Sequence, residues 1–144
     1  MSLYSLIKDP LKAISWMKWV DIDAGQLEGA EKRKVLIFPC SLIAESSVSN
    51  DITESGDVQR EDATLTLRLA WDATGSRTNA SSPETVQERS LAYTVQTKEV
   101  YELLQGAIFG DYTSLECGSA VQEKNTDGLV VFKFTFKTNQ IVIK

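Results

Sequence analysis

The chain has 144 residues, of which 15 are Lys or Arg, 20 are Asp or Glu and none is His, so its net charge at pH 7 is −5. This length predicts a single domain spanning residues 1–144, and the lack of histidine excludes Ser-His-Asp catalysis and histidine metal ligands. The negative charge disfavours binding to nucleic acid or to an anionic membrane surface, and no stretch is apolar for long enough to span a membrane.

The first segment, residues 3–17, has the periodicity of an amphipathic helix. Its apolar residues recur every three or four positions: Leu3, Ile7, Leu11 and Ile14. Because Pro10 follows Asp9, we expect the helix either to kink there or to restart with Asp9 as its N-cap. A short strand is expected next, at residues 18–22.

Two β-strands with different patterns are expected at residues 34–44 and 63–72. The first is almost entirely apolar, which predicts cover on both faces. Pro39 within it indicates an edge position or a bulge, because proline cannot donate a ladder hydrogen bond. The second strand alternates apolar and polar residues, so one of its faces should be buried. That face consists of Leu65, Leu67, Leu69 and Trp71.

Residues 45–62, between these strands, are predominantly polar, and we expect them to form one long loop. The segment contains a single base, Arg60, and six acids: Glu45, Asp51, Glu54, Asp57, Glu61 and Asp62. It therefore carries the whole net charge of the chain. Loops of this length are usually functional or disordered. The acids lack the DxDxDG spacing of a calcium-binding loop, so we expect no metal site.

A long helix is expected after a second polar loop at residues 73–81. Ser82 as N-cap and Pro83 at the first helical position predict its start, and Gly106 predicts its end. Its expected apolar face consists of Ala92, Val95, Val100, Leu103 and Leu104.

Two further strands are expected at residues 112–122 and 129–137, joined by a tight turn at Asp127-Gly128. In the first strand, one face carries Leu115, Cys117, Ser119 and Val121. In the second, the residues expected to point inward are Val130, Phe132, Phe134 and Phe136, and those expected to point outward are Val131, Lys133, Thr135 and Lys137. The apolar tail is expected either to add an edge strand or to dock on a neighbour, and it consists of Ile141, Val142 and Ile143.

This order of elements predicts an α+β fold, with an antiparallel or mixed sheet of about five strands and an N-terminal helix and one long helix packed on it. Cys40 and Cys117 are expected to be buried thiols, and Trp16 and Trp19 are expected to pack into the core. The sequence has no glycine-rich phosphate loop and no nucleophile–base pattern. We therefore expect no catalytic residue, no cofactor and no metal.

Four segments together resemble the tail terminator, or tail-completion, proteins of long-tailed phages and prophages. These segments are the helix that leads into residues 18–23 with Gly25-Gln26, the strand containing Phe38-Pro39, the strand at 65–71, and residues 100–106 followed by 127–129 and a Phe-rich strand. The resemblance covers most of the chain in order and spacing.

The resemblance implies an α+β subunit of a homo-oligomeric ring, usually a hexamer, that caps the tail tube and meets head-completion proteins. Such proteins are not enzymes and use no cofactor; they assemble in the cytoplasm and end in the virion. We then expect the acids of residues 45–62 to face either a partner protein or the ring lumen, where a negative wall repels DNA phosphates. Residues 141–143 would form the oligomer edge.

Two other classes of protein fit the same elements. One is an unrelated α+β domain that serves as a protein–protein interaction or scaffold module. The other is a small-ligand-binding domain or enzyme with a pocket between helix and sheet. The mass in solution separates the ring from the first class, and a ligand-dependent rise in melting temperature favours the second.

Overall fold

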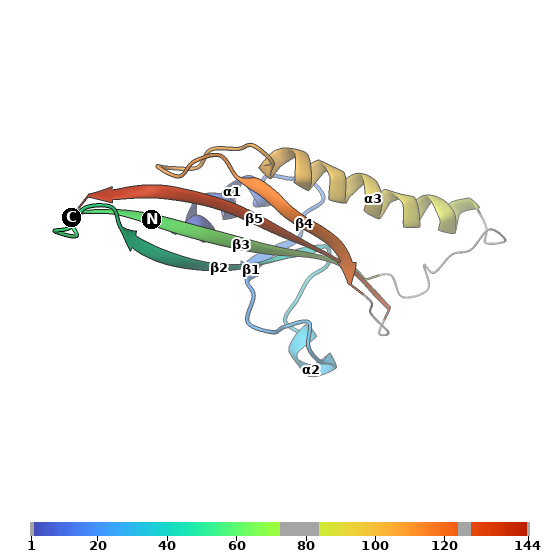
Figure 1. Cartoon of the computed structure of the whole chain (residues 1–144). Coiled ribbons are helices and arrows are strands. Elements are labelled where there is room, and N and C mark those ends of the chain that lie inside the picture. Colours follow the sequence, from blue (N-terminus) through green and yellow to red (C-terminus); the bar gives the residue numbers. More distant parts are fainter. Residues whose placement is uncertain (1, 73–83, 124–127, 144) are drawn as a thin grey trace.

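A five-stranded mixed sheet forms the body of the computed structural model, which describes residues 2–72, 84–123 and 128–143 (Figure 1). In chain order the elements are α1 (Leu3–Lys12), β1 (Trp19–Ile22), α2 (Ala30–Arg33), β2 (Cys40–Asp51), β3 (Val58–Asp72), α3 (Glu84–Leu104), β4 (Glu116–Glu123) and β5 (Leu129–Ile143). The strand order is β1-β2-β3-β5-β4, with β1 parallel to β2 and every other pair antiparallel. The α+β fold expected from the sequence is confirmed, including its N-terminal helix and its long helix.

The two central strands are much longer than the outer ones. β3 and β5 have 15 residues each and pair along their whole length, from Val58 opposite Ile143 to Asp72 opposite Leu129. β1 pairs only with residues 40–43, and β4 pairs only with residues 131–137. One half of the sheet therefore has five strands, and the other half has three.

The main core lies on the face of the sheet that carries α1 and α3, which we call the helical face. The alternating pattern of β3 predicts one buried face, and Leu65, Leu67 and Leu69 are indeed fully buried on the helical face. The two helices cover them with further fully buried residues: Leu3, Ile7, Leu11, Val100 and Leu104. Burying each of these side chains contributes about 1.5–3 kcal/mol to folding.

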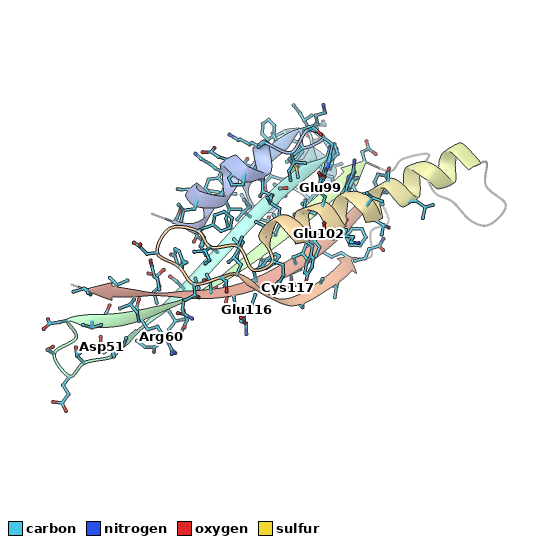
Figure 2. The ribbon with its side chains drawn as sticks, turned by 90° about the horizontal axis from the view of Figure 1, so that it is seen from above. Asp51, Arg60, Glu99, Glu102, Glu116 and Cys117 are labelled. Atoms are coloured by element: carbon cyan, nitrogen blue, oxygen red, sulfur yellow. The ribbon has the colours of Figure 1, made fainter. Side chains whose placement is uncertain are left out.

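Hydrogen bonds from two stacked tryptophans attach α3 to this core. The rings of Trp16 and Trp71 stack with centroids 6.1 Å apart. Trp71 Nε1 donates a hydrogen bond to Gln96 Oε1 of α3 at 2.6 Å, and Trp16 Nε1 donates to the carboxylate of Glu99, which Figure 2 shows on the same helix. Trp16 thus packs against the core as expected, and Trp19 packs against the second cluster described next.

A smaller cluster covers part of the opposite face, which we call the open face. The connection from β1 to β2, which includes α2, packs there against the five-stranded half of the sheet. The cluster consists of Leu27, Leu36, Cys40, Leu42, Ala70, Leu129 and Val131. Val131 was expected to point to solvent; it does lie on the face opposite Phe134, but this connection buries it.

The strand expected at residues 34–44 begins only at Cys40. Residues 34–39 belong to the connection, and Val35 and Ile37 are exposed within it. β2 starts where a partner becomes available, because Trp19 of β1 pairs with Cys40. An apolar run indicates a strand only when a neighbouring strand can accept its hydrogen bonds.

The long acidic loop expected at residues 45–62 is instead a β-hairpin. β2 continues to Asp51 and β3 begins at Val58, so only residues 52–57 form the turn, with Gly56 at a φ of +73°. The ladder runs without interruption from Glu45 opposite Leu65 to Asp51 opposite Gln59. A strand that is exposed on both faces has no apolar alternation, so polarity alone does not distinguish it from a loop.

The long helix ends as expected, but only two residues of its expected apolar face, Val100 and Leu104, are buried. Gly106 follows its last turn with a φ of +76°, whereas the expected N-cap at Ser82 and the loop at 73–81 lie outside the described residues. Among the residues of α3 whose side chains are described, Tyr93, Thr97, Val100 and Leu104 pack toward the core or are buried. Val95 is 69% exposed, and Ala92 and Leu103 are exposed too. The buried stripe follows the three-and-four spacing from 93 to 104, which excludes them.

Three smaller differences concern element ends. α1 stops at Lys12 and contains Pro10, and its N-cap is Ser2, whose Oγ accepts from the Ser5 amide at 3.2 Å, so the helix does not restart at Asp9. β4 begins at Glu116 and has a bulge between Cys117 and Ser119. The bulge moves Ser119 and Val121 to the open face, away from the core that Leu115 and Cys117 contact. The expected turn residue Asp127 lies outside the described residues.

Candidate assembly surfaces

The three-stranded half of the sheet forms an arm, which we define as residues 45–62 together with residues 138–143. Figure 1 shows it as the narrow extension that contains the C-terminus and reaches beyond α1. β1 and β4 do not extend along it, so in the described structure the outer edges of β2 and β5 have no partner strand there. Open strand edges of this kind readily pair with another chain.

The outer edge of β5 presents both backbone and apolar groups. The Asn139 carbonyl accepts from the Thr113 amide at 2.7 Å, and its amide donates to Thr113 Oγ1 at 3.2 Å, so Asn139 directs its backbone groups away from β3. Because alternate residues of a strand direct these groups to the same side, Ile141 and Ile143 present theirs to the open edge. Their side chains are 52% and 78% exposed. Residues 141–143, the expected oligomer edge, are therefore the end of β5: they pair with β3 on one side, and on the other side they have no partner strand among the described residues.

Apolar side chains gather on the open face of the arm. The register places Val48 opposite Asp62, Ile141 opposite Arg60 and Ile143 opposite Val58, so all of these residues alternate with the buried leucines of β3. Val48 is 64% exposed, and Ile52 in the turn is exposed as well. This patch has no cover in the described part of the chain.

Two of the six acids of residues 45–62 have structural roles within the molecule. Glu45 accepts hydrogen bonds from the Leu3 and Tyr4 amides at 3.1 and 3.3 Å, so it satisfies the N-terminus of α1. Glu61 accepts from Tyr112 Oη at 2.9 Å. Burial and the neighbouring Glu61 raise the pKa of Tyr112 to about 12. Both acids lie on the helical face, where they connect the arm to the core.

Of the other four acids, Asp51, Glu54 and Asp57 lie at the tip of the arm, and Asp62 lies near its base. Asp51 accepts from Gln59 Nε2 at 2.6 Å, Asp57 accepts from Ser55 Oγ at 2.8 Å, and Asp62 accepts from Arg60 Nη2 at 3.1 Å. Glu54 is exposed in the turn. Figure 2 shows Asp51 and Arg60 at the end of the arm that is remote from α3. The structure thus separates the six acids into two that support the core, three at the tip of the arm and one near its base.

A groove of about 410 Å³ lies at the opposite edge strand, β1, and is lined by Lys12, Met17, Lys18, Trp19 and Val20. Lys12 and Lys18 are exposed, whereas Met17 is buried and accepts a hydrogen bond from Ser41 Oγ at its sulfur. Trp19 Nε1 is buried without an acceptor among the described residues. Sequence reasoning missed this groove, because its residues come from the end of α1 and from β1 and meet only in the fold.

The outer edge of β1 is open as well. The Lys18 amide donates to the Pro39 carbonyl at 3.0 Å, so Lys18 directs its backbone groups toward β2. By alternation, Trp19 and Asp21 present theirs to solvent. The groove thus combines an unpaired strand edge with an apolar floor and two lysines.

A second cavity, of about 510 Å³, lies beside β5 at the point where β4 begins. It is polar and is lined by Asp62, Ala63, Thr64, Thr113, Ser114, Glu116, Lys137, Thr138 and Asn139. Its base is held by the pair of hydrogen bonds between Thr113 and Asn139. The cavity marks the point at which the five-stranded half becomes the arm.

An ion-pair cluster on the open face holds the connection against the sheet. Arg68 lies 2.7 Å from Glu123, 3.1 Å from Glu28 and 3.6 Å from Asp23. Burial lowers the pKa of this guanidinium, but the hydrogen bonds to Glu123 and Glu28 more than offset it, so the net shift is upward. These contacts join β3, β4 and the segment before α2. The role of Arg68 is therefore structural.

Neither metal-binding geometry nor a membrane-spanning helix is found in the described ranges. These residues contain no group of three or more Asp, Glu, Cys or His side chains that could hold a metal ion. No described helix is long and apolar enough to cross a membrane. Burial raises the pKa of the Cys40 thiol to about 12, so this cysteine is inert at neutral pH.

Comparison with known proteins finds a similar fold among solved structures. No family model and no curated protein matches the sequence. Among solved structures, the fold matches a chain of a structure described as the virion of a native gene transfer agent (GTA) particle, with a TM-score of 0.59 and 10% sequence identity. The match covers 98% of this chain and 96% of that one. At this identity, the match establishes a common fold.

Proposed function

We propose that this protein is a structural subunit of a phage-like virion. The observation that carries the proposal is the correspondence of nearly the whole chain, from end to end, with a chain of a gene transfer agent virion. A match over 96% of the other chain means that the two proteins share one architecture and not a common submotif. The arm supports the same conclusion, because two open strand edges and an exposed apolar patch are a liability in a monomer.

The finer form of the proposal is a tail terminator: a homo-oligomeric ring, usually a hexamer, that caps the tail tube and meets head-completion proteins. The support is the sequence resemblance together with edge strands on both sides of the sheet. Ring closure requires two different surfaces on each subunit, one for each neighbour. In this role the protein performs no catalysis and uses no cofactor.

Native mass spectrometry of the full chain, combined with electron microscopy, tests the proposal. We expect a discrete closed oligomer, alone or after addition of tail tubes from the same particle, and density at one end of each tube. A protein that stays monomeric over a wide concentration range and never binds tube ends would contradict it.

The position of the acidic residues in such a ring is a separate prediction. If the arms lined the channel, Asp51, Glu54 and Asp57 would repel DNA phosphates, as the sequence suggests. A ring reconstruction tests this, because the channel radius shows directly whether the arm tips line it. Arm tips that contact a neighbouring subunit would contradict the channel position and favour the alternative of a protein partner.

A further inference from the structure

We propose that the arm of one copy docks in the β1 groove of a second copy, with the acidic tip against Lys12 and Lys18. This inference rests on the proposed function and names the two surfaces that would join neighbouring subunits. The occupant of the groove is a second copy of this chain, because each molecule carries both the arm and the groove.

Charge and polarity match across the proposed contact. The arm tip combines exposed apolar side chains with the carboxylates of Asp51, Glu54 and Asp57. The groove combines an apolar floor with two exposed lysines. Complementary charge around an apolar centre is the usual arrangement of a specific protein interface.

The arm of a molecule cannot reach the groove of the same molecule. The groove lies beside Trp19, which pairs with Cys40 at the start of β2, whereas the tip lies beyond Asp51 at its end. β2 is one continuous strand of 12 residues, so its two ends are roughly 35–40 Å apart. The contact must therefore form between copies.

The backbone supplies a second kind of complementarity. Trp19 and Asp21 present unpaired amide groups on the outer edge of β1, and the arm has unpaired edges on β2 and β5. Pairing of two such edges would satisfy the groups that each chain leaves open. The buried Trp19 Nε1 lies in the same region and lacks an acceptor among the described residues.

The contact uses different surfaces on its two sides and is therefore head-to-tail. Repetition of a head-to-tail contact generates either a closed ring or an open filament. Each subunit would give its arm to one neighbour and receive the arm of the other. This property yields a specific test, because a variant without a functional arm can still receive one.

The first experiment reverses charge on each surface separately. The arm variant D51K/E54K/D57K and the groove variant K12E/K18E should each raise the concentration needed for assembly by about tenfold to a hundredfold. The matched control K34E/K98E changes two exposed lysines that do not line the groove. It should assemble as the wild type does.

Mixing the arm variant with the groove variant should restore the oligomer of the wild type in native mass spectrometry. In that mixture one contact has a normal arm and a normal groove, and in the other the lysines of the changed arm meet the glutamates of the changed groove, so opposite charges again face each other. A mixture that assembles no better than either variant alone would overturn the inference.

The second experiment detects the contact even where assembly is weak. In a C117S background, a chain with E54C is mixed with a chain with K18C under mild oxidation. We expect a mixed disulfide dimer at least tenfold more abundant than with K98C, a control at an exposed lysine of α3. Equal yields for the two partners would overturn the docking.

The outcomes keep the two proposals apart. A stable wild-type ring whose size is unchanged by K12E/K18E, without the mixed disulfide, would remove the docking contact and leave the virion role intact. The mixed disulfide in a protein that never binds tail tubes would leave the docking and remove the proposed function.

Discussion

At the scale of single residues, chemically identical side chains take different roles because the fold places them differently. Glu45 and Glu54 belong to the same acidic segment, yet one caps a helix and the other is exposed in a turn. Cys40 is fully buried, whereas Cys117 is only partly buried, with its Sγ 3.3 Å from the Ser119 carbonyl. The expectation that both thiols are buried is therefore correct for Cys40 alone.

The cysteines should differ in reactivity. Since burial raises the pKa of Cys40 to about 12, only Cys117 should react with a thiol reagent in the native protein at neutral pH. Cys40 should react only after unfolding, which a colorimetric thiol assay with and without denaturant measures. The C117S variant provides the control and should show no native reaction. Two rapidly reacting thiols in the native state would contradict the burial of Cys40.

Tyr112 should make stability fall at alkaline pH. Burial and Glu61 raise its pKa from 10.0 to about 12 in the folded state, so between these values the unfolded chain loses its proton while the folded chain keeps it. Its contribution is fully present below pH 10 and is lost as the pH rises toward 12, by up to about 3 kcal/mol. Denaturant unfolding across this range measures the decline. In Y112F the decline should be smaller, and an identical decline would contradict the assignment.

At the scale of elements, the contacts that hold a helix or strand decide which of its residues matter. α1 depends on a carboxylate from β2, because Glu45 accepts the Leu3 and Tyr4 amides. α3 is held along one stripe, and the rest of its apolar residues are exposed. Each of these statements gives a paired mutational test.

Replacement of Glu45 by Gln should destabilise the protein by about 1 kcal/mol, because the N-terminus of α1 loses a negatively charged acceptor. Replacement of Glu54 by Gln removes the same charge from an exposed turn and should change stability by less than about 0.5 kcal/mol. Chemical denaturation of both variants measures the difference. Equal losses would show that Glu45 does not support the helix.

Two valines of α3 provide a second pair. Val100 is fully buried, so its replacement by Ala should cost about 2 kcal/mol through lost burial and a residual cavity. Val95 is 69% exposed, and its replacement by Ala should be neutral or slightly stabilising because Ala has the higher helix propensity. Thermal unfolding of the two variants compares them. A larger loss at Val95 than at Val100 would contradict the observed exposure of Val95.

At the scale of the whole molecule, stability is distributed unevenly. The five-stranded half is covered by helices on one face and by the β1–β2 connection on the other, whereas the arm is exposed on most of its surface. The net charge of the chain follows the same division, since the segment of residues 45–62 carries all of it. The arm is charged and has little buried apolar surface, whereas the rest of the molecule has no net charge. The arm is therefore suited to contact with another molecule.

Hydrogen exchange should show this division directly. In the monomer, amides of residues 47–51 and 58–61 should exchange at least about a hundredfold faster than those of residues 65–69, because opening the arm breaks few apolar contacts. Mass spectrometry of peptides from both regions measures the ratio. In the assembled protein, the arm should become protected while residues 65–69 stay unchanged. An arm as protected as the core in the monomer would contradict a separately opening unit.

Elements whose burial follows a regular period could be predicted from the order of residues alone. The alternation of Leu65, Leu67 and Leu69, the spacing of Leu3, Ile7 and Leu11, and the stop at Gly106 all appear in the structure as expected. Each depends on neighbours along the chain, which one sequence contains.

The cover of each sheet face and the positions of the open strand edges could not be predicted, because they arise from contacts between distant parts of the chain. Folding turned an expected loop into the hairpin of the arm. It also buried Val131, exposed Val95 and brought Lys12 and Trp19 to one groove. These outcomes depend on strand partners and covering segments that are distant in sequence, and no local period encodes them. The surfaces proposed for assembly belong to this second group, because a strand edge exists only where the rest of the sheet ends.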